Sequence, residues 1–270
     1  MSRFNKYALI FKYILTLICW FFFNQVQAQE EQLLENLIAD RPDATESPNA
    51  VSPGTLQIET GSFYTSFEKE KIKNEILGLN TTLLRYGLLD RLELRVGWNF
   101  EEVRTSLDGN KLNHVQSGFS PMLVGMKVEV TEEKGLLPEI GLLVHTYLPL
   151  LASSDYRPET TGVDFRFSFA HTIDEKSGIA YNLGSQWGND SSEAAFVYTI
   201  VYGYAINDKL SVYAEFYGDM PEDNKANHYF DTGLTYLINN NVQLDAYLGR
   251  GVNDVQDILL GAGISIRIPK

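Results

Sequence analysis

The stretch "RLELRVGWNF", residues 91–100, alternates apolar side chains with polar or small ones over its whole length. Since neighbouring side chains of a β-strand point to opposite faces, this pattern puts an apolar row on one face and a polar row on the other. The same period returns in "VDFRFSF" (163–169), "VQLDAYLG" (242–249) and "DILLGAGISIRI" (257–268). The repeated alternation predicts an all-β protein.

Strand patterns follow one another from about residue 54 to the end of the chain. Most are about ten residues or longer, which suits a tilted crossing of a bilayer, whereas ordinary strands average about five or six residues. This length favours a membrane barrel over a lipocalin-like barrel or a soluble sandwich. We expect twelve strands, near residues 55–68, 74–88, 91–103, 116–131, 136–149, 162–174, 178–188, 194–206, 209–218, 227–238, 241–250 and 257–268.

The connections alternate between tight turns, such as "INDK" at 206–209, and longer polar stretches. The longer ones are expected at 103–115, 150–161, 189–193, 219–226 and 251–256. Short periplasmic turns and longer outer loops are typical of a transmembrane antiparallel up-and-down β-barrel. An even number of strands then leaves both termini on the periplasmic side.

The first 28 residues differ from the rest. Arg3, Lys6 and Lys12 accompany the apolar run "LIFKYILTLICWFFF", and a small residue, Ala28, offers a cleavage site. This layout predicts a secretory signal peptide over residues 1–28. We expect residues 29–53 to form a short periplasmic, plug-like segment and residues 54–270 to form a barrel in the outer membrane of a Gram-negative bacterium.

The charge balance limits the partners. Without its signal peptide the chain would carry a formal charge of about −16, since the whole chain carries −13 and the peptide holds three basic residues. Nucleic acid is therefore not an expected partner, because binding it requires a basic face. We expect outer-membrane lipids and lipopolysaccharide around the barrel, the barrel-assembly machinery during biogenesis, and neither a cofactor nor a metal.

Four segments carry a resemblance to a known family. "DRPDATESPNAVSPGTLQIETGSFY" (40–64) and "LLRYGLLDRLELRVG" (83–97) resemble the opening of the family named for a putative MetA pathway of phenol degradation. "DTGLTYLINNNVQLDAYLGRGVND" (231–254) and "LLGAGISIRI" (259–268) resemble its closing strands. Members of this family are identified as outer-membrane transporters, so the resemblance implies the same fold and location here.

The polar faces of the strands would converge on a lumen. Charged side chains two positions apart point the same way, as Glu93 and Arg95 do, and such pairs can neutralise one another or tune which solutes enter. The candidate lumen-lining residues are Glu59, Glu93, Arg95, Lys127, Glu129, Glu139, His145, Asp164, Arg166, Glu215, Asp231, Asp245 and Arg267.

The segment before the first strand is a candidate stopper for this lumen. Pro42, Pro48 and Pro53 prevent it from forming a helix or joining a ladder. We expect it to fold into or across the periplasmic mouth, with Asp40, Arg41 and Asp43 pairing with inward charges such as Arg95 and Glu93.

Three functions remain open from the sequence. The favoured one is passive diffusion of small solutes, hydrophobic or aromatic ones among them, through an outer-membrane channel. The second is a closed barrel with a structural or surface-binding role. The third, a lipid-modifying barrel enzyme, is disfavoured because none of the four histidines sits in a nucleophile signature and no G-x-S-x-G occurs. We therefore expect no catalytic residues.

Overall fold

The computed structural model describes residues 36–253 and 256–270, which belong to one compact unit. The signal peptide expected over residues 1–28, and the first residues of the expected plug segment, lie outside this part of the chain. Within it, no helix is long and apolar enough to cross a membrane.

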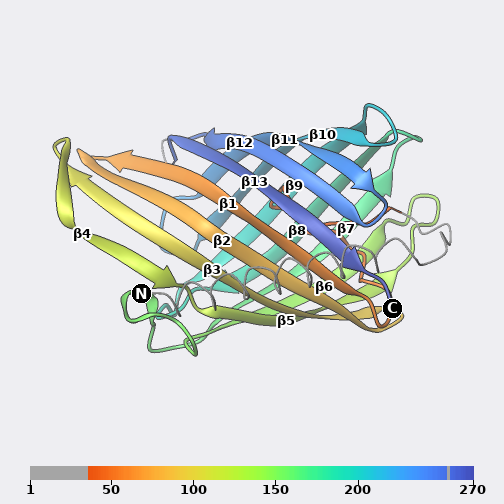
Figure 1. Ribbon diagram of the computed structural model, residues 1–270, viewed down its shortest axis with the longest axis horizontal. Coiled ribbons are helices and arrows are strands. Elements are labelled where there is room, and N and C mark those ends of the chain that lie inside the picture. The colour runs from red at the N-terminus through yellow and green to blue at the C-terminus, as the bar shows by residue number, and fades with distance from the viewer. Residues whose placement is uncertain (1–35, 254–255) are drawn as a thin grey trace, which may run out of the picture. The chain divides into compact units, whose positions relative to one another are not determined.

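The described chain is almost entirely β-structure (Figure 1). A single 3-10 turn, η1 (Ser154–Tyr156), interrupts the succession of strands. The strands are β1 (Leu56–Lys69), β2 (Ile72–Leu89), β3 (Leu92–Leu107), β4 (Asn110–Phe119), β5 (Met122–Thr131), β6 (Glu139–Leu148), β7 (Gly162–Thr172), β8 (Ser177–Trp187), β9 (Ala194–Ala205), β10 (Leu210–Pro221), β11 (Asn227–Asn239), β12 (Val242–Gly251) and β13 (Ile258–Ile268).

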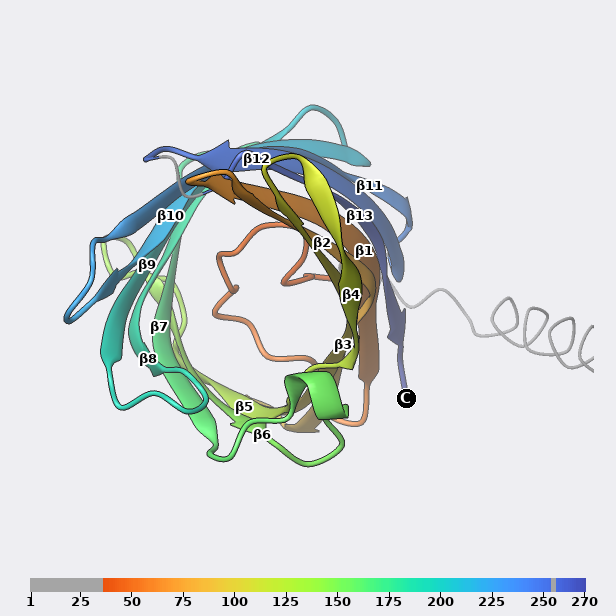
Figure 2. The ribbon, with the colours of Figure 1, turned by 90° about the vertical axis from the view of Figure 1, so that its left-hand side faces the viewer.

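The sheet closes on itself into a barrel, seen end-on in Figure 2. All strand pairings are antiparallel, and β1 pairs with β13 from Leu56↔Ile268 to Ser66↔Ile258. β4 and β5 share one position in the wall, because β3 pairs with β4 along its second half and with β5 along its first half. The thirteen strands therefore fill twelve wall positions, which confirms the predicted twelve-strand antiparallel barrel.

The structure corrects the outer loop expected at 103–115. This region is a hairpin, because β3 continues to Leu107 and β4 begins at Asn110. Asp108 and Gly109 make the turn with φ values of 50° and 78°. An Asp-Gly pair favours this left-handed conformation, which matches the twist of a two-residue hairpin.

The strand expected at 116–131 is also corrected, because it is broken in two. β4 ends at Phe119 and β5 starts at Met122. Pro121 stands in the break, where it has no amide hydrogen to contribute to a ladder. The Ser120 amide still donates to the Asn99 carbonyl of β3 (2.9 Å), so a hydrogen bond to β3 is kept within the break.

The two ends of the barrel differ. We call the end that carries both β1's first residue and β13's last residue the turn end, and the opposite end the loop end. The connections at the turn end span residues 90–91, 132–138, 173–176, 206–209 and 240–241, and those at the loop end span 70–71, 108–109, 149–161, 188–193, 222–226 and 252–257.

The two faces of the wall have opposite character. On β3, the outward Leu94 is 40 % exposed, whereas the inward Glu93 and Arg95 are buried. The charged residues are thus inside and the large apolar ones outside, the reverse of a soluble protein and the arrangement of a barrel surrounded by lipid. Outward apolar side chains of other strands include Phe167, Ile200, Phe216, Leu244 and Leu260.

This arrangement predicts a position-dependent cost for outward charges. Ile200 lies in the middle of β9 and Ile206 just beyond its turn end, with similar exposure of 48 % and 46 %. We expect Ile200→Arg to lower the free energy of unfolding by about 2–4 kcal/mol and Ile206→Arg by about 0–1 kcal/mol, because the cost of an arginine falls toward the interface. Urea unfolding in lipid vesicles measures both. Equal costs would contradict a lipid-facing surface.

Candidate functional site

The chain before β1 runs through the inside of the barrel (Figure 2). We call residues 36–55 the strap. Pro42, Pro48 and Pro53 lack amide hydrogens, and the strap forms no strand of the sheet. Next to β1 it makes one isolated parallel bridge, between Pro53 and Gly87 of β2. The remaining backbone groups of the strap need partners inside the lumen, because buried amides are costly when left unbonded.

Inward side chains of the barrel supply these partners. Most are carboxylates, which bond strongly to backbone amides. The donors and acceptors are Asp40 N to Glu59 (3.1 Å), Ala44 N to Glu215 (2.7 Å), Glu46 N to Asn182 Oδ1 (2.7 Å), Ala50 N to Glu129 (2.7 Å) and Val51 N to Glu93 (2.9 Å). The strap is thereby fixed to strands on opposite sides of the lumen.

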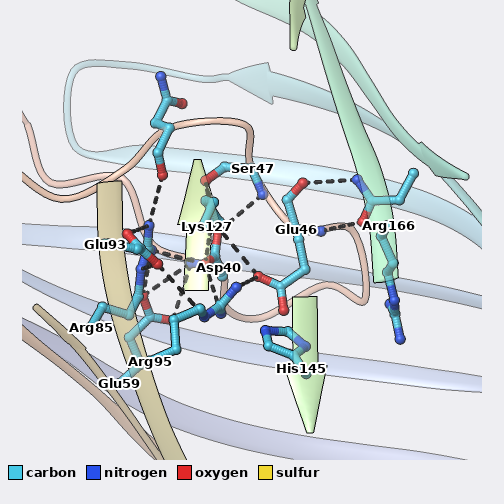
Figure 3. A network of polar contacts seen from close by, with 12 residues as sticks. Asp40, Glu46, Ser47, Glu59, Arg85, Glu93, Arg95, Lys127, His145 and Arg166 are labelled. Atoms are coloured by element: carbon cyan, nitrogen blue, oxygen red, sulfur yellow. Dashed lines mark hydrogen bonds and ion pairs between the residues drawn. The ribbon is translucent and has the colours of Figure 1, made fainter. Parts of the chain in front are cut away.

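Asp40 is the centre of a buried ion cluster (Figure 3). Its carboxylate lies 2.8 Å from Lys127 Nζ, 3.1 Å from Arg95 Nη2 and 3.1 Å from Arg85 Nη1. Burial by itself raises the pKa of a carboxyl, but Arg85, Lys127 and Arg95 outweigh it and hold the pKa of Asp40 well below its usual value. Asp40 is therefore ionised and tied to three cations of the wall.

Further acids surround the same three cations. Arg85 reaches Glu59 (2.9 Å) and Glu93 (2.9 Å), and it also donates to the Asn49 carbonyl of the strap (2.9 Å). Glu46 of the strap lies 2.8 Å from Arg95. The cluster thus joins the strap to β1, β2, β3 and β5 through side chains that water barely reaches.

Arg41 and Asp43 point to the other side of the lumen. Arg41 forms a two-bond ion pair with Asp245 of β12 (2.9 and 3.1 Å). Asp43 takes part in no ion pair among the described residues. Burial raises the pKa of Asp43 well above its usual value, and the nearby Glu215 and Asp231 raise it further. Of the three strap residues expected to pair with wall charges, Asp40 and Arg41 do so and Asp43 does not.

The strap separates two cavities. One, of about 460 Å³, is lined by Pro42 and Asp43 of the strap and by turn-end residues such as Ser177. The other, of about 360 Å³, is lined by Asp40 and Glu46 and by loop-end residues such as Asn189. Arg41 borders both cavities. The strap therefore stands between the two ends of the lumen.

The predicted lumen-lining residues fall into two groups. Nine are buried inside the barrel: Glu59, Glu93, Arg95, Lys127, His145, Asp164, Glu215, Asp231 and Asp245. Four are half-buried: Glu129, Glu139, Arg166 and Arg267. Among the described residues, none of the His, Cys, Asp or Glu groupings could hold a metal ion.

The alternation in the sequence does not predict some of the inward residues. Arg85 contacts both strap and wall, yet it lies in "TTLLRYGLL" (81–89), where two adjacent leucines and bulges in the pairing hide the alternation. Tyr147 and Tyr217 resemble interface aromatics by position near strand ends, but Tyr147 donates to the buried Asp164 (2.8 Å). Tyrosines of β10, β11 and β12 share the inward face with the acids: Tyr213, Tyr217, Tyr229 and Tyr247.

The ion cluster yields a prediction for Asp40→Asn. Removing this charge leaves Lys127 and Arg95 without their main buried partner, and breaking such pairs costs about 3 kcal/mol or more. We expect amide exchange protection across the strap to fall roughly 100-fold, because local opening of the strap becomes easier. Hydrogen exchange with mass spectrometry measures it. Asp208→Asn, at an exposed turn, is the control, and unchanged protection in Asp40→Asn would contradict the role of the cluster.

The acids of the strap predict a dependence on pH. Because the pKa of Asp43 is raised when the strap is docked, docking favours its protonated form and weakens as pH rises from the usual value of 3.8 through the raised one. Asp40 has the opposite effect: because its pKa is lowered in the docked strap, docking weakens as the pH falls below 3.8. Burial also raises the pKa of Glu46, so it adds to the weakening.

We therefore expect strap protection, corrected for intrinsic exchange rates, to fall as pH is raised from 4 toward 8 in the wild type. The Asp43→Asn variant removes one of the two contributing acids. It should show a smaller fall and higher protection at neutral pH. A steeper fall in the variant would refute this assignment.

Comparisons with known proteins agree with this architecture. Among solved structures, the chain is similar to an outer membrane channel from Pseudomonas putida F1, with 15 % identity, a TM-score of 0.61, and 84 % of this chain and 100 % of that chain covered. It is also similar to the translocator domain of the autotransporter NalP from Neisseria meningitidis, with 9 % identity, a TM-score of 0.50, and 81 % and 90 % covered. At these identities the likeness concerns the fold, that of outer-membrane barrels.

Sequence comparison adds the family. Among curated protein sequences, none matches this chain. The family profile described as "Putative MetA-pathway of phenol degradation" matches residues 39–268, which include nearly all of the strap and the whole barrel. This match confirms the resemblance carried by residues 40–64 and 83–97. The chain belongs to the family of the putative MetA pathway of phenol degradation.

Proposed function

We propose that the protein is an outer-membrane channel for small solutes, and that the strap is its stopper. The observation that carries this proposal is the pair of cavities, about 460 and 360 Å³, on either side of a strap that is held by side-chain contacts. Residues 38–51 of the strap have no backbone bridge to the wall, so this part can leave the lumen without breaking a strand pairing. In the same proposal, the turn end faces the periplasm, and lipids and lipopolysaccharide surround the outward apolar face.

The lining of the lumen supports aromatic solutes among those that pass. Tyr217 and Tyr229 stack with ring centroids 5.1 Å apart on the inward face of β10 and β11. Leu83, Leu123 and Tyr147 line the loop-end cavity beside its charged residues. Flat apolar surfaces next to hydrogen-bonding groups suit a small ring that carries a hydroxyl.

An enzymatic function has less support. His145 Nδ1 lies 3.2 Å from Asp164, which resembles the base and the acid of a nucleophile–base–acid arrangement. However, His145 Nε2 and the buried Ser168 Oγ each have no hydrogen-bond partner among the described residues, so no serine is bonded to this histidine. We propose that the protein is not an enzyme.

The experiment compares the wild type with Asp40→Asn in planar lipid bilayers and in swelling liposomes. Because Asp40→Asn loosens the strap, we expect its conductance and its uptake of a small sugar such as arabinose to exceed those of the wild type severalfold. Phenol added to the bath should reduce the Asp40→Asn current in a saturable way, since it would occupy the tyrosine-lined wall.

The alternative is a closed barrel with a structural or surface-binding role, which the many bonds of the strap favour. It predicts no current and no swelling in either protein. That result, obtained with folded and membrane-inserted Asp40→Asn whose strap is exchange-labile, would reject the channel. Asp208→Asn again controls for a change of charge alone.

A further inference from the structure

The side chain of Arg41 occupies a pocket that the barrel wall builds around it. Asp245 accepts from Arg41 Nε (3.1 Å) and Nη2 (2.9 Å), which is the two-bond geometry that matches a guanidinium to a carboxylate. The Tyr247 ring lies 5.9 Å from Arg41 Cζ, within reach of a cation–π contact. Thr81 Oγ1 accepts from Nη1 at 3.4 Å.

Glycines form the floor of this pocket. Gly61 of β1 and Gly263 of β13 are paired in the register, and a Cβ atom at either position would overlap the guanidinium of Arg41. A Cβ atom at Gly261 would overlap the Tyr247 ring in the same way. The small residues of "GAG" (261–263) therefore make room for a flat cation and for the aromatic ring beside it.

The pocket belongs to the barrel and not to the strap. Its walls come from β1, β2, β12 and β13, which are held together by their own strand pairings. The Asp245 side chain is fully buried, and its one ion pair among the described residues is with Arg41. When the strap leaves the lumen, the wall keeps its shape, and a buried carboxylate remains that favours a new cation.

From this geometry we infer that the pocket of Gly61, Thr81, Asp245, Tyr247 and Gly263 is a binding site for the guanidinium or amidinium group of a solute, which Arg41 fills while the strap is docked. The inference deepens the proposed function and rests on it for the access of solutes. A solute with such a group competes with Arg41 for Asp245, and its binding releases the strap from β12.

The shape of the pocket sets its selectivity. A planar guanidinium can make both bonds to Asp245 and lie flat over the glycine floor, whereas an ammonium is a compact point charge that matches neither feature. Arg41 is tethered, so its effective concentration in the pocket is high and a free ligand competes poorly in the wild type. Removing the Arg41 side chain should therefore reveal the site.

The test measures binding directly. Methylguanidinium is titrated into the purified Arg41→Ala protein in detergent micelles, and saturation transfer to its methyl signal is followed by NMR. We expect a saturable signal with half-saturation on the order of 1–10 mM. We expect binding at least tenfold weaker for the wild type, for the double variant Arg41→Ala/Asp245→Asn, and for methylammonium on Arg41→Ala.

Equal signals from Arg41→Ala and the double variant, or no saturable signal from Arg41→Ala, would overturn the inference. The double variant Arg41→Ala/Asp208→Asn controls for lost charge and should bind as Arg41→Ala does. Arg41→Ser takes the place of Arg41→Ala if the alanine protein does not fold. Since the measurement requires no flux, saturable binding without conductance rejects only the channel, and conductance without binding rejects only this site.

Discussion

A carboxylate buried among three cations holds this molecule in the state described. Three cations of the wall project into the lumen: Arg85, Arg95 and Lys127. The neighbouring wall acids, Glu59 and Glu93, neutralise only part of their charge. Charges out of water need partners at close range, since an unpaired buried ion is far more costly than a paired one. Asp40 supplies the missing negative charge, and it belongs to the strap, which lies inside the barrel and is not part of its wall.

The dependence between strap and wall is mutual. Between residues 38 and 51 the strap has no backbone partner in the wall, so its amides there rely on wall carboxylates such as Glu215 and Glu129. The wall carboxylates in turn accept hydrogen bonds from the strap amides. Without the strap, water would have to donate these hydrogen bonds. Each side thus completes the hydrogen bonding of the other, and loosening a few contacts at the centre weakens many around it.

The two sides of the lumen hold the strap by different means. On β2, β3 and β5 the strap is held by an ion cluster with several partners for each charge. On β10 to β12 the acids outnumber the bases: Arg41 satisfies Asp245, but Asp43, Glu215 and Asp231 have no ion pair among the described residues. On the second side a bound proton or cation can therefore reduce the excess of negative charge. The tyrosines lie on this same side.

The sequence by itself determined the fold class, the face of most strands and the position of the strap before β1. It could do so because the period of two and the prolines at 42, 48 and 53 act locally, over neighbouring residues. Nine of the predicted lumen residues are buried for the same reason. The break between β4 and β5 was missed because Pro121 can be read as an edge residue until the partner strand is known.

Only the tertiary structure decided which charges meet. Asp40 and Lys127, or Arg41 and Asp245, are separated by 87 and 204 residues, and their contact depends on barrel closure and on the path of the strap. Arg85 was hidden by a bulged, leucine-rich stretch, and the glycine pocket for Arg41 exists only where β1 and β13 are joined. Alternation tells which side chains point inward, but the shape of the closed barrel decides which of them can touch.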